Sequence, residues 1–175
     1  DNNNLNVIDV SSNTSLRYLS CSNNSLSTLD IDNNDDLKHL LCNNNNIESI
    51  DLSNAEDLFL LYTQNNQIQN LDISNNPDVK YINAENNMLS NIDIRNGNNH
   101  RISQFIVTDN QSLTCIFVDD TSASYLRNWQ VGSSCNFVAD EGECQTLSSQ
   151  EVTAVDFKMY PNPATTVVNV NLNVP

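Results

Sequence analysis

Positive charge is scarce in this chain of 175 residues. Lys and Arg number only 7 against 22 Asp and Glu, which gives a formal net charge of −15. A surface this acidic repels phosphate backbones and anionic lipid headgroups, so we expect no nucleic-acid partner and no direct membrane insertion. It does favour solubility, as for a protein outside the cell.

Glycine, histidine and long apolar runs are scarce as well. Three glycines form no phosphate-binding loop, and the two histidines belong to no Ser-His-Asp series and no H-E-x-x-H motif. No run of about 18 apolar residues predicts a membrane-spanning helix, and no signal peptide is visible. Because residue 1 falls inside a repeat, we expect the N-terminus of the natural protein to lie upstream. The sequence therefore predicts neither an enzyme nor a bound cofactor.

Asparagine, in contrast, makes up roughly a fifth of the chain, far above ordinary usage. Apolar residues and Asn pairs recur in register every 21 residues, which argues for an ordered repeat rather than disorder. The clearest columns are Leu16, Leu37, Leu58 and Val79; Leu19, Leu40, Leu61 and Ile82; Asn23, Asn44, Asn65 and Asn86; and Asn24, Asn45, Asn66 and Asn87.

The repeating unit reads L-x-x-L-x-(C/L)-x-x-N-x-L over residues 1–118, and it resembles the signature of leucine-rich repeat proteins. Each unit holds two nested halves with the same spacing, as in the short bacterial class of 21-residue repeats. This resemblance implies a repeat solenoid that is mainly β, with two short strands per coil and a C-terminal cap. Coils of this kind stack at about 4.8 Å, and each buries its aliphatic side chains only against its neighbours.

Asn pairs suit the turns of such coils, because an amide offers a donor and an acceptor to backbone groups and tolerates turn conformations. Cys21 and Cys42 share an inward column with Thr63 and Ala84, where small residues are needed. We expect them to be buried free thiols, with a disulfide or a metal site as the alternative.

Residues 119–144 follow the last coil and are expected to cap it. Within 119–129, Tyr125, Leu126 and Trp129 predict a short helix with one apolar face. Three cysteines remain for this end, and Cys115 is expected to pair with Cys135 or Cys144; we favour Cys115–Cys135. A disulfide indicates an oxidising compartment. Residues 137–156 show no clear period, and 145–156 is predicted to be a linker.

The segment from "NIDIRNGNN" to Cys135 resembles the closing part of secreted leucine-rich repeat proteins from Bacteroidetes. Residues 157–175, "FKMYPNPATTVVNVNLNVP", resemble the start of the C-terminal sorting domain of the type IX secretion system, carried by Tyr160, Pro161, Asn162 and Pro163. The alternating residues after them fit a half-buried strand. The resemblance implies type IX secretion, contact with its machinery, and a secreted or outer-membrane cell-surface location; the alternative is a Pro-rich linker with a stray strand.

A candidate ligand site lies on the outward positions of the first strand in each coil, which is the usual ligand surface of leucine-rich repeat proteins. Exposed aromatic residues at such positions mark interaction sites, and tyrosine rings stack on sugars or bury against proteins. The alternative is that scattered apolar residues merely help form the sheet. The predicted patch consists of Tyr18, His39, Leu41, Leu60, Tyr62 and Tyr81.

The second half of each coil carries a column of aspartates: Asp9, Asp30, Asp51, Asp72 and Asp93. Carboxylates about 4.8 Å apart repel one another by roughly 1 to a few kcal/mol per pair. Hydrogen bonds to neighbouring Ser and turn amides, together with water, offset this repulsion in the favoured interpretation. Ca²⁺ is a weak alternative, since no D-x-D-x-D-G loop is present, so we predict no metal.

Together these features predict a non-catalytic recognition protein at the cell surface that binds a protein or glycan through a rigid strand face. Within an outer-membrane complex, a glycan-capture module for nutrient uptake is one alternative, and an adhesin or stalk spacer without a specific ligand is another. A further alternative is that these residues are one domain of a larger enzyme whose catalytic part lies upstream.

Overall fold

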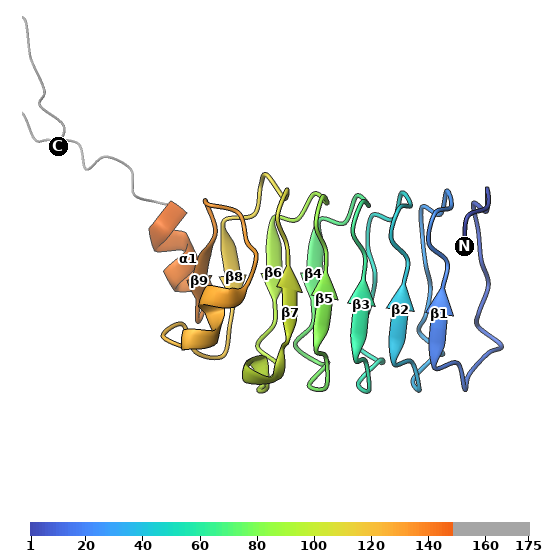
Figure 1. Ribbon diagram of the computed structural model, residues 1–175, viewed down its shortest axis with the longest axis horizontal. Coiled ribbons are helices and arrows are strands. Elements are labelled where there is room, and N and C mark those ends of the chain that lie inside the picture. The colour runs from blue at the N-terminus through green and yellow to red at the C-terminus, as the bar shows by residue number, and fades with distance from the viewer. Residues whose placement is uncertain (149–175) are drawn as a thin grey trace, which may run out of the picture.

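The computed structural model describes residues 1–148, which wind into a β-solenoid of stacked coils (Figure 1). From Tyr18 on, each coil contributes one strand to a five-stranded parallel sheet, sheet A, in the order β1-β2-β3-β5-β7. Its register pairs Leu19 with Leu40, Leu40 with Leu61, and so on up to Phe105, as the repeat columns predict. The strands are β1 Tyr18–Ser20, β2 His39–Leu41, β3 Leu60–Tyr62, β5 Tyr81–Asn83 and β7 Gln104–Ile106.

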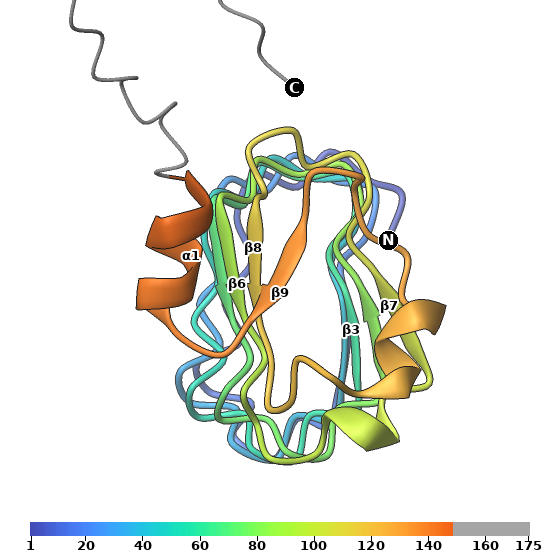
Figure 2. The same ribbon diagram turned by 90° about the vertical axis from the view of Figure 1, so that its left-hand side faces the viewer.

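A second parallel sheet, sheet B, lies opposite sheet A across the core (Figure 2). Between the two sheets, the columns of Leu, Ile and Val side chains are buried, so that each coil depends on its neighbours for its apolar contacts. This arrangement confirms the predicted leucine-rich repeat solenoid. The strands of sheet B are β4 Asn70–Asp72, β6 Asn91–Asp93, β8 Cys115–Phe117 and β9 Asn136–Val138.

Two strands per coil are present only from β3 and β4 onward. In the earlier coils, residues 28–30 and 49–51 occupy the corresponding positions but are not strands. A hollow of about 330 Å³, lined by Ser49, Asp51 and Asn70 among others, lies between residues 49–51 and β4. Residues 49–51 therefore do not pair with β4 on this side of the solenoid, although sheet A stays continuous.

The two members of each Asn pair have different roles in the turn. The first adopts the left-handed conformation, with φ of 56° at Asn23, 57° at Asn44, 60° at Asn65 and 52° at Asn86. Asn is among the few non-glycine residues that tolerate this region, which explains the column in a chain with so few glycines. The amides of this column also bond to one another along the solenoid, with Nδ2–Oδ1 distances of 2.6–2.8 Å.

The second member of the pair turns inward and bonds to backbone groups of two coils. Asn45 donates to the carbonyls of Cys21 (3.1 Å) and Cys42 (2.9 Å) and accepts from the Leu26 amide (3.0 Å). Asn66 and Asn87 repeat this pattern, and both are buried. The predicted function of the Asn residues at the turns is confirmed.

The solenoid continues beyond the last repeat that the sequence reveals. Gln130 bridges to Ile106 at the edge of sheet A, and β9 pairs with β8 in sheet B, so 119–138 forms a further coil. On it the 3-10 helix η2 (Ser124–Asn128) buries Leu126, and Trp129 covers Phe105 with ring centroids 4.4 Å apart. The cap predicted over 119–129 therefore covers the open core. The two-residue insertion before β7 forms a second 3-10 turn, η1 (Asn99–Arg101).

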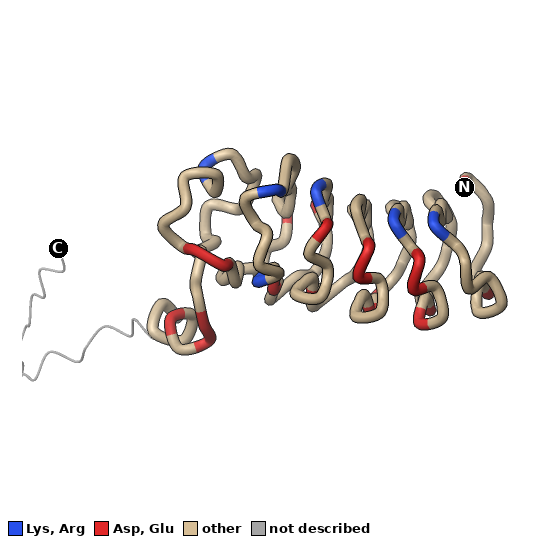
Figure 3. Tube along the Cα trace, turned by 90° about the horizontal axis from the view of Figure 1, so that it is seen from below, with Lys and Arg blue, Asp and Glu red and all other residues tan. Residues whose placement is uncertain are grey.

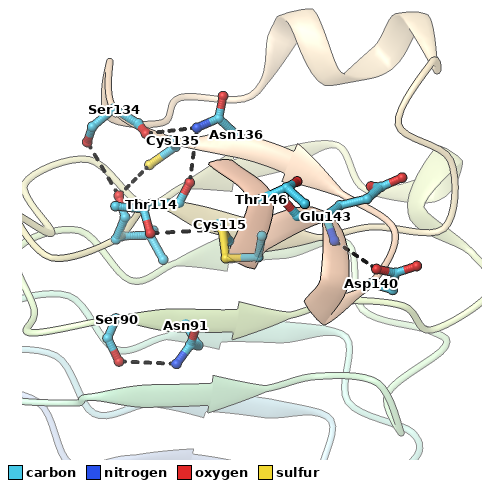
Figure 4. Close-up of a disulfide and its surroundings, with 12 residues drawn as sticks. Ser90, Asn91, Thr114, Cys115, Ser134, Cys135, Asn136, Asp140, Glu143 and Thr146 are labelled. Atoms are coloured by element: carbon cyan, nitrogen blue, oxygen red, sulfur yellow. Dashed lines mark hydrogen bonds between the residues drawn. A yellow bond between two sulfur atoms is a disulfide. The ribbon is translucent and has the colours of Figure 1, made fainter. Parts of the chain in front are cut away.

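The preferred disulfide pairing was wrong, because Cys115 bonds to Cys144 and leaves Cys135 free (Figure 4). In the register of β8 and β9, Cys115 lies opposite Asn136. Since side chains alternate along a strand, Cys135 points to the other side, where it packs against the main core. Cys115 faces outward with Phe117 and Val138, and Cys144 covers them.

Cys144 lies on the helix α1 (Glu141–Ser148), which covers the outer face of sheet B at its last strands (Figure 2). Residues 137–156, which show no clear period in the sequence, thus contain most of β9 and all of α1. The linker predicted from residue 145 begins inside that helix. No helix in residues 1–148 is long and apolar enough to span a membrane. The predicted sorting motif, Tyr160–Pro163, lies outside the described residues.

Candidate functional site

Sheet A presents its outward residues in two columns, because side chains alternate across a strand. Tyr18, His39, Leu60 and Tyr81 belong to the first column, which the pairing of β1, β2, β3 and β5 sets in register. Tyr18 is the most exposed of the predicted patch, with 57% of its surface accessible. Leu41 and Tyr62 belong to the second column, and like the remaining patch residues they are half-buried.

Four rings form a continuous row along sheet A, and three of them belong to the first column. The centroids of Tyr18 and His39 are 5.8 Å apart, those of His39 and Phe59 are 5.8 Å apart, and those of Phe59 and Tyr81 are 5.4 Å apart. Tilted and edge-to-face rings at these distances attract one another beyond their shared burial. We call Tyr18, His39, Phe59 and Tyr81 the aromatic row. The row is thus held in place by ring contacts as well as by the sheet.

Phe59 was missing from the predicted patch, because it precedes β3 instead of lying within it. The strand-like hydrogen bonding extends one residue beyond the strands: Lys38 N bonds to Arg17 O at 3.0 Å, Phe59 N to Lys38 O at 2.8 Å, and Lys80 N to Phe59 O at 2.9 Å. These residues form a third column, Arg17–Lys38–Phe59–Lys80. An aromatic residue in a column of cations is the signal in the sequence that identifies Phe59.

Tyr62 is separate from the aromatic row. Its hydroxyl donates to Oε1 of Gln104 at 3.0 Å, two coils further on. Because Gln104 pairs with Tyr81, this bond ties the Tyr62 ring to the first column, while Leu41 is the partner of Tyr62 on strand β2. The predicted residues therefore divide into two columns, one with Tyr18, His39, Leu60 and Tyr81 and one with Leu41 and Tyr62.

Basic residues are concentrated near the aromatic row. Six of the seven Lys and Arg residues lie in the described chain, and most of them follow one long side of the solenoid (Figure 3). Lys38 pairs with Asp57 at 3.0 Å and Arg101 with Asp78 at 2.9 Å. These four residues, with Phe59, Lys80 and His39, line a shallow hollow of about 410 Å³. We call it the edge hollow.

The aspartates of the column accept hydrogen bonds from their own turns. Oδ1 of Asp9, Asp51 and Asp72 accepts the backbone N–H two residues later at 2.9 Å, as the favoured interpretation requires. A hydrogen bond from the Ser11 side chain lowers the pKa of Asp9, and one from the Ser53 backbone lowers that of Asp51. Asp30 bonds in the same way, at 3.0 Å. Over residues 1–148, no three His, Cys, Asp or Glu side chains come together to hold a metal ion.

The last aspartate of the column, Asp93, faces different neighbours. Burial opposes its ionisation, but hydrogen bonds from Arg95 outweigh that effect and lower its pKa. Arg95 Nε lies 3.0 Å from Oδ1, and its guanidinium covers the Phe117 ring at 4.9 Å. Arg95 also bonds to Glu141 at 3.2 Å, so this group attaches α1 to sheet B.

Cys21 and Cys42 are buried free thiols, as expected. Burial raises the pKa of Cys21 to about 11 and that of Cys42 well above its ordinary value. A thiol is nucleophilic only as the thiolate, so neither residue is a candidate nucleophile. Burial also raises the pKa of the half-buried Cys135.

Comparison with known proteins shows the fold class. The functional domain of InlJ from Listeria monocytogenes, which includes a cysteine ladder, is similar to 77% of this chain at 22% sequence identity, with a TM-score of 0.51. LIC12759, a leucine-rich repeat protein of Leptospira interrogans, is similar to 77% of the chain at 18% identity, with a TM-score of 0.50. The chain spans 38% and 34% of their lengths. No protein-family model and no curated protein matches the sequence.

The chain therefore has the leucine-rich repeat fold. Many functions share one fold, so the function has to be argued from the site.

Proposed function

We propose that this protein is a non-catalytic recognition protein that binds a protein or glycan partner through sheet A. The aromatic row carries the proposal: four rings in mutual contact lie on one outward face of a continuous parallel sheet. Aromatic side chains dominate the energetics of interfaces, and a rigid face loses little entropy on binding. Leu41, Leu60 and Tyr62 extend the apolar surface on either side.

The proposal is tested by removing rings from the face without touching the core. Tyr18 and Tyr62 lie on different columns, so the double substitution Tyr18→Ala and Tyr62→Ala weakens the whole surface. We expect binding to mucin-coated surfaces, whole cells or a glycan array to fall at least about tenfold, since each interface tyrosine contributes about 1 kcal/mol or more.

A matched control changes two exposed strand residues on the opposite sheet, Asn70→Ala and Asn91→Ala. This control should bind like the wild type. Equal binding by the tyrosine variant would refute the proposal and favour a spacer, in which the repeats set only reach. Binding to glycans but not to proteins would favour the alternative of a glycan-capture module for nutrient uptake.

The proposed location is the cell surface or the extracellular medium. The Cys115–Cys144 disulfide supports it, since disulfides persist in oxidising compartments. Export by type IX secretion through the segment containing Tyr160, Pro161, Asn162 and Pro163 is part of the same proposal. Deleting 157–175 and following the protein in the culture medium tests it, and unchanged export contradicts it.

A further inference from the structure

The edge hollow differs from the rest of the surface in charge. The chain has a net charge of −15, yet Lys38, Lys80 and Arg101 meet Asp57 and Asp78 here, which leaves an excess of one positive charge among these Lys, Arg and Asp side chains. Two of the cations are paired with carboxylates at 3.0 and 2.9 Å. Lys80 has no acidic partner within 4.0 Å among residues 1–148 and is therefore available to a ligand.

An aromatic wall adjoins this free cation. The Lys80 ammonium lies 5.5 Å from the centroid of the Phe59 ring, and Phe59 contacts both His39 and Tyr81. A ligand that covers Phe59 thus meets an apolar ring face and a free ammonium together. At about 410 Å³, the hollow is within the range of small-molecule sites but is shallow, as for one or two sugar rings.

The mixed lining favours a sugar over an acidic peptide. Sugar hydroxyls both donate and accept hydrogen bonds, so they use Asp57 and Asp78 as acceptors and the neighbouring cations as donors. A peptide with several carboxylates meets two carboxylates in the hollow and a strongly negative chain around it. One carboxylate on an otherwise hydroxylated ring matches the single excess charge.

We propose that the edge hollow binds a sugar residue carrying one carboxylate, of the uronic acid class. The Phe59 ring packs against the C–H face of the sugar, Lys80 binds its carboxylate, and the Asp57 and Asp78 carboxylates accept from its hydroxyls. This rests on the proposed function of sheet A, because the hollow adjoins the aromatic row, and it names the ligand chemistry at one end of that surface.

The test uses two probes that differ only at C6, where methyl β-D-glucuronide carries a carboxylate and methyl β-D-glucoside a neutral hydroxymethyl group. Each is titrated into the full chain while backbone amide resonances are followed by NMR. We expect the glucuronide to bind about threefold to fivefold more tightly and to shift the signals of Phe59, Lys80 and Arg101, since an exposed ion pair contributes up to about 1 kcal/mol.

Two substitutions separate the charge from the ring. Lys80→Gln breaks no ion pair, so it leaves no carboxylate unpaired; it should remove the preference for the glucuronide and leave glucoside binding unchanged. Phe59→Leu should weaken both sugars by a similar factor, about twofold to fivefold, because the ring contact does not depend on charge. Arg127→Gln removes a cation outside the hollow and should change neither affinity.

Three outcomes overturn the inference: no binding of the glucuronide, equal binding of both sugars, or tighter binding of a pentaglutamate peptide than of the glucuronide. The proposed function is tested independently by Tyr18 and Tyr62, neither of which lines the hollow. If their substitution abolishes binding to mucin or cells while the glucuronide leaves the spectrum unchanged, the sugar assignment fails and the recognition surface stands. If instead the tyrosine substitutions leave binding to mucin and cells unchanged while the glucuronide binds as expected, the proposed recognition function of sheet A fails and the sugar assignment stands.

Discussion

The substitution Asn45→Leu tests the inward-facing Asn residues of the turns, which hold the coils in the arrangement that both sheets require. Asn and Leu side chains have the same number of heavy atoms and the same branching, so the change removes hydrogen bonds with little change in volume. Asn45 is buried, with 8% of its surface accessible, and its side chain bonds to Cys21, Cys42 and Leu26. Leucine satisfies none of these groups.

The loss of the Asn45 side-chain hydrogen bonds costs a different free energy at each of its three backbone partners. The Cys21 carbonyl keeps a bond from Asn24, and the Cys42 carbonyl keeps one from Asn66, so each loses only one of two, about 1 kcal/mol. The Leu26 N–H loses its acceptor and is left unsatisfied, which costs about 1–3 kcal/mol. Burying the leucine side chain returns about 2 kcal/mol. We expect a net destabilisation of about 2 kcal/mol.

The neighbouring residue supplies the control, because Asn46 is exposed. Asn46→Leu should change stability by less than about 0.5 kcal/mol. Urea unfolding of both variants and the wild type gives the difference, with thermal melts expected to separate by about 4–8 °C. If the two leucine variants unfold together, the inward amides do not stabilise the coils and the reasoning fails.

Three further outcomes concern the C-terminal cap and the aspartate column. Non-reducing peptide mapping should link Cys115 to Cys144, and Cys144→Ser should destabilise the cap by up to about 3–4 kcal/mol for a separation of 29 residues; a Cys115–Cys135 peptide would contradict the structure. The lowered pKa of Asp93 stabilises the fold above the unfolded value, near 3.8, and this contribution is lost as pH falls through the folded value; Arg95→Gln should therefore flatten the decline in stability below about pH 4, and parallel curves would refute the pairing. Thermal melts with calcium and with a chelator should coincide, and a shift of several degrees would show that the Asp column binds cations.

Columns in the sequence were sufficient to predict the sheet that matters for function. A period of 21 residues sets Leu19, Leu40 and Leu61 in register, and the structure pairs them directly. The period also places Asn at each turn, where backbone conformation and buried polar groups both require it. These inferences held because each coil contacts mainly its neighbours, so local spacing determines three-dimensional position.

Where the repeat ends, spacing no longer determines position. Cys135 and Cys144 were both candidates in the sequence, with Cys135 wrongly favoured, and only the parallel register of β8 and β9 shows that Cys135 faces the core. The extra coil before β9 lacks the repeat pattern, because Trp129 and Phe137 cover the core in place of aliphatic columns. The ligand face was predicted from strand positions alone, so Phe59, one residue before its strand, was missed.

Phe59 links the stability of sheet A to its proposed recognition function. Its column otherwise contains Arg17, Lys38 and Lys80, one per coil. A lysine at position 59 would place like charges about 4.8 Å apart along the backbone, which costs roughly 1 kcal/mol per neighbouring pair in water. The phenyl ring removes that repulsion and attracts Lys80 through its face, an effect of about 0.5–1 kcal/mol at an exposed site. Phe59, which separates Lys38 from Lys80, is therefore also the residue that connects His39 to Tyr81, so one side chain both continues the aromatic row and keeps these two cations apart.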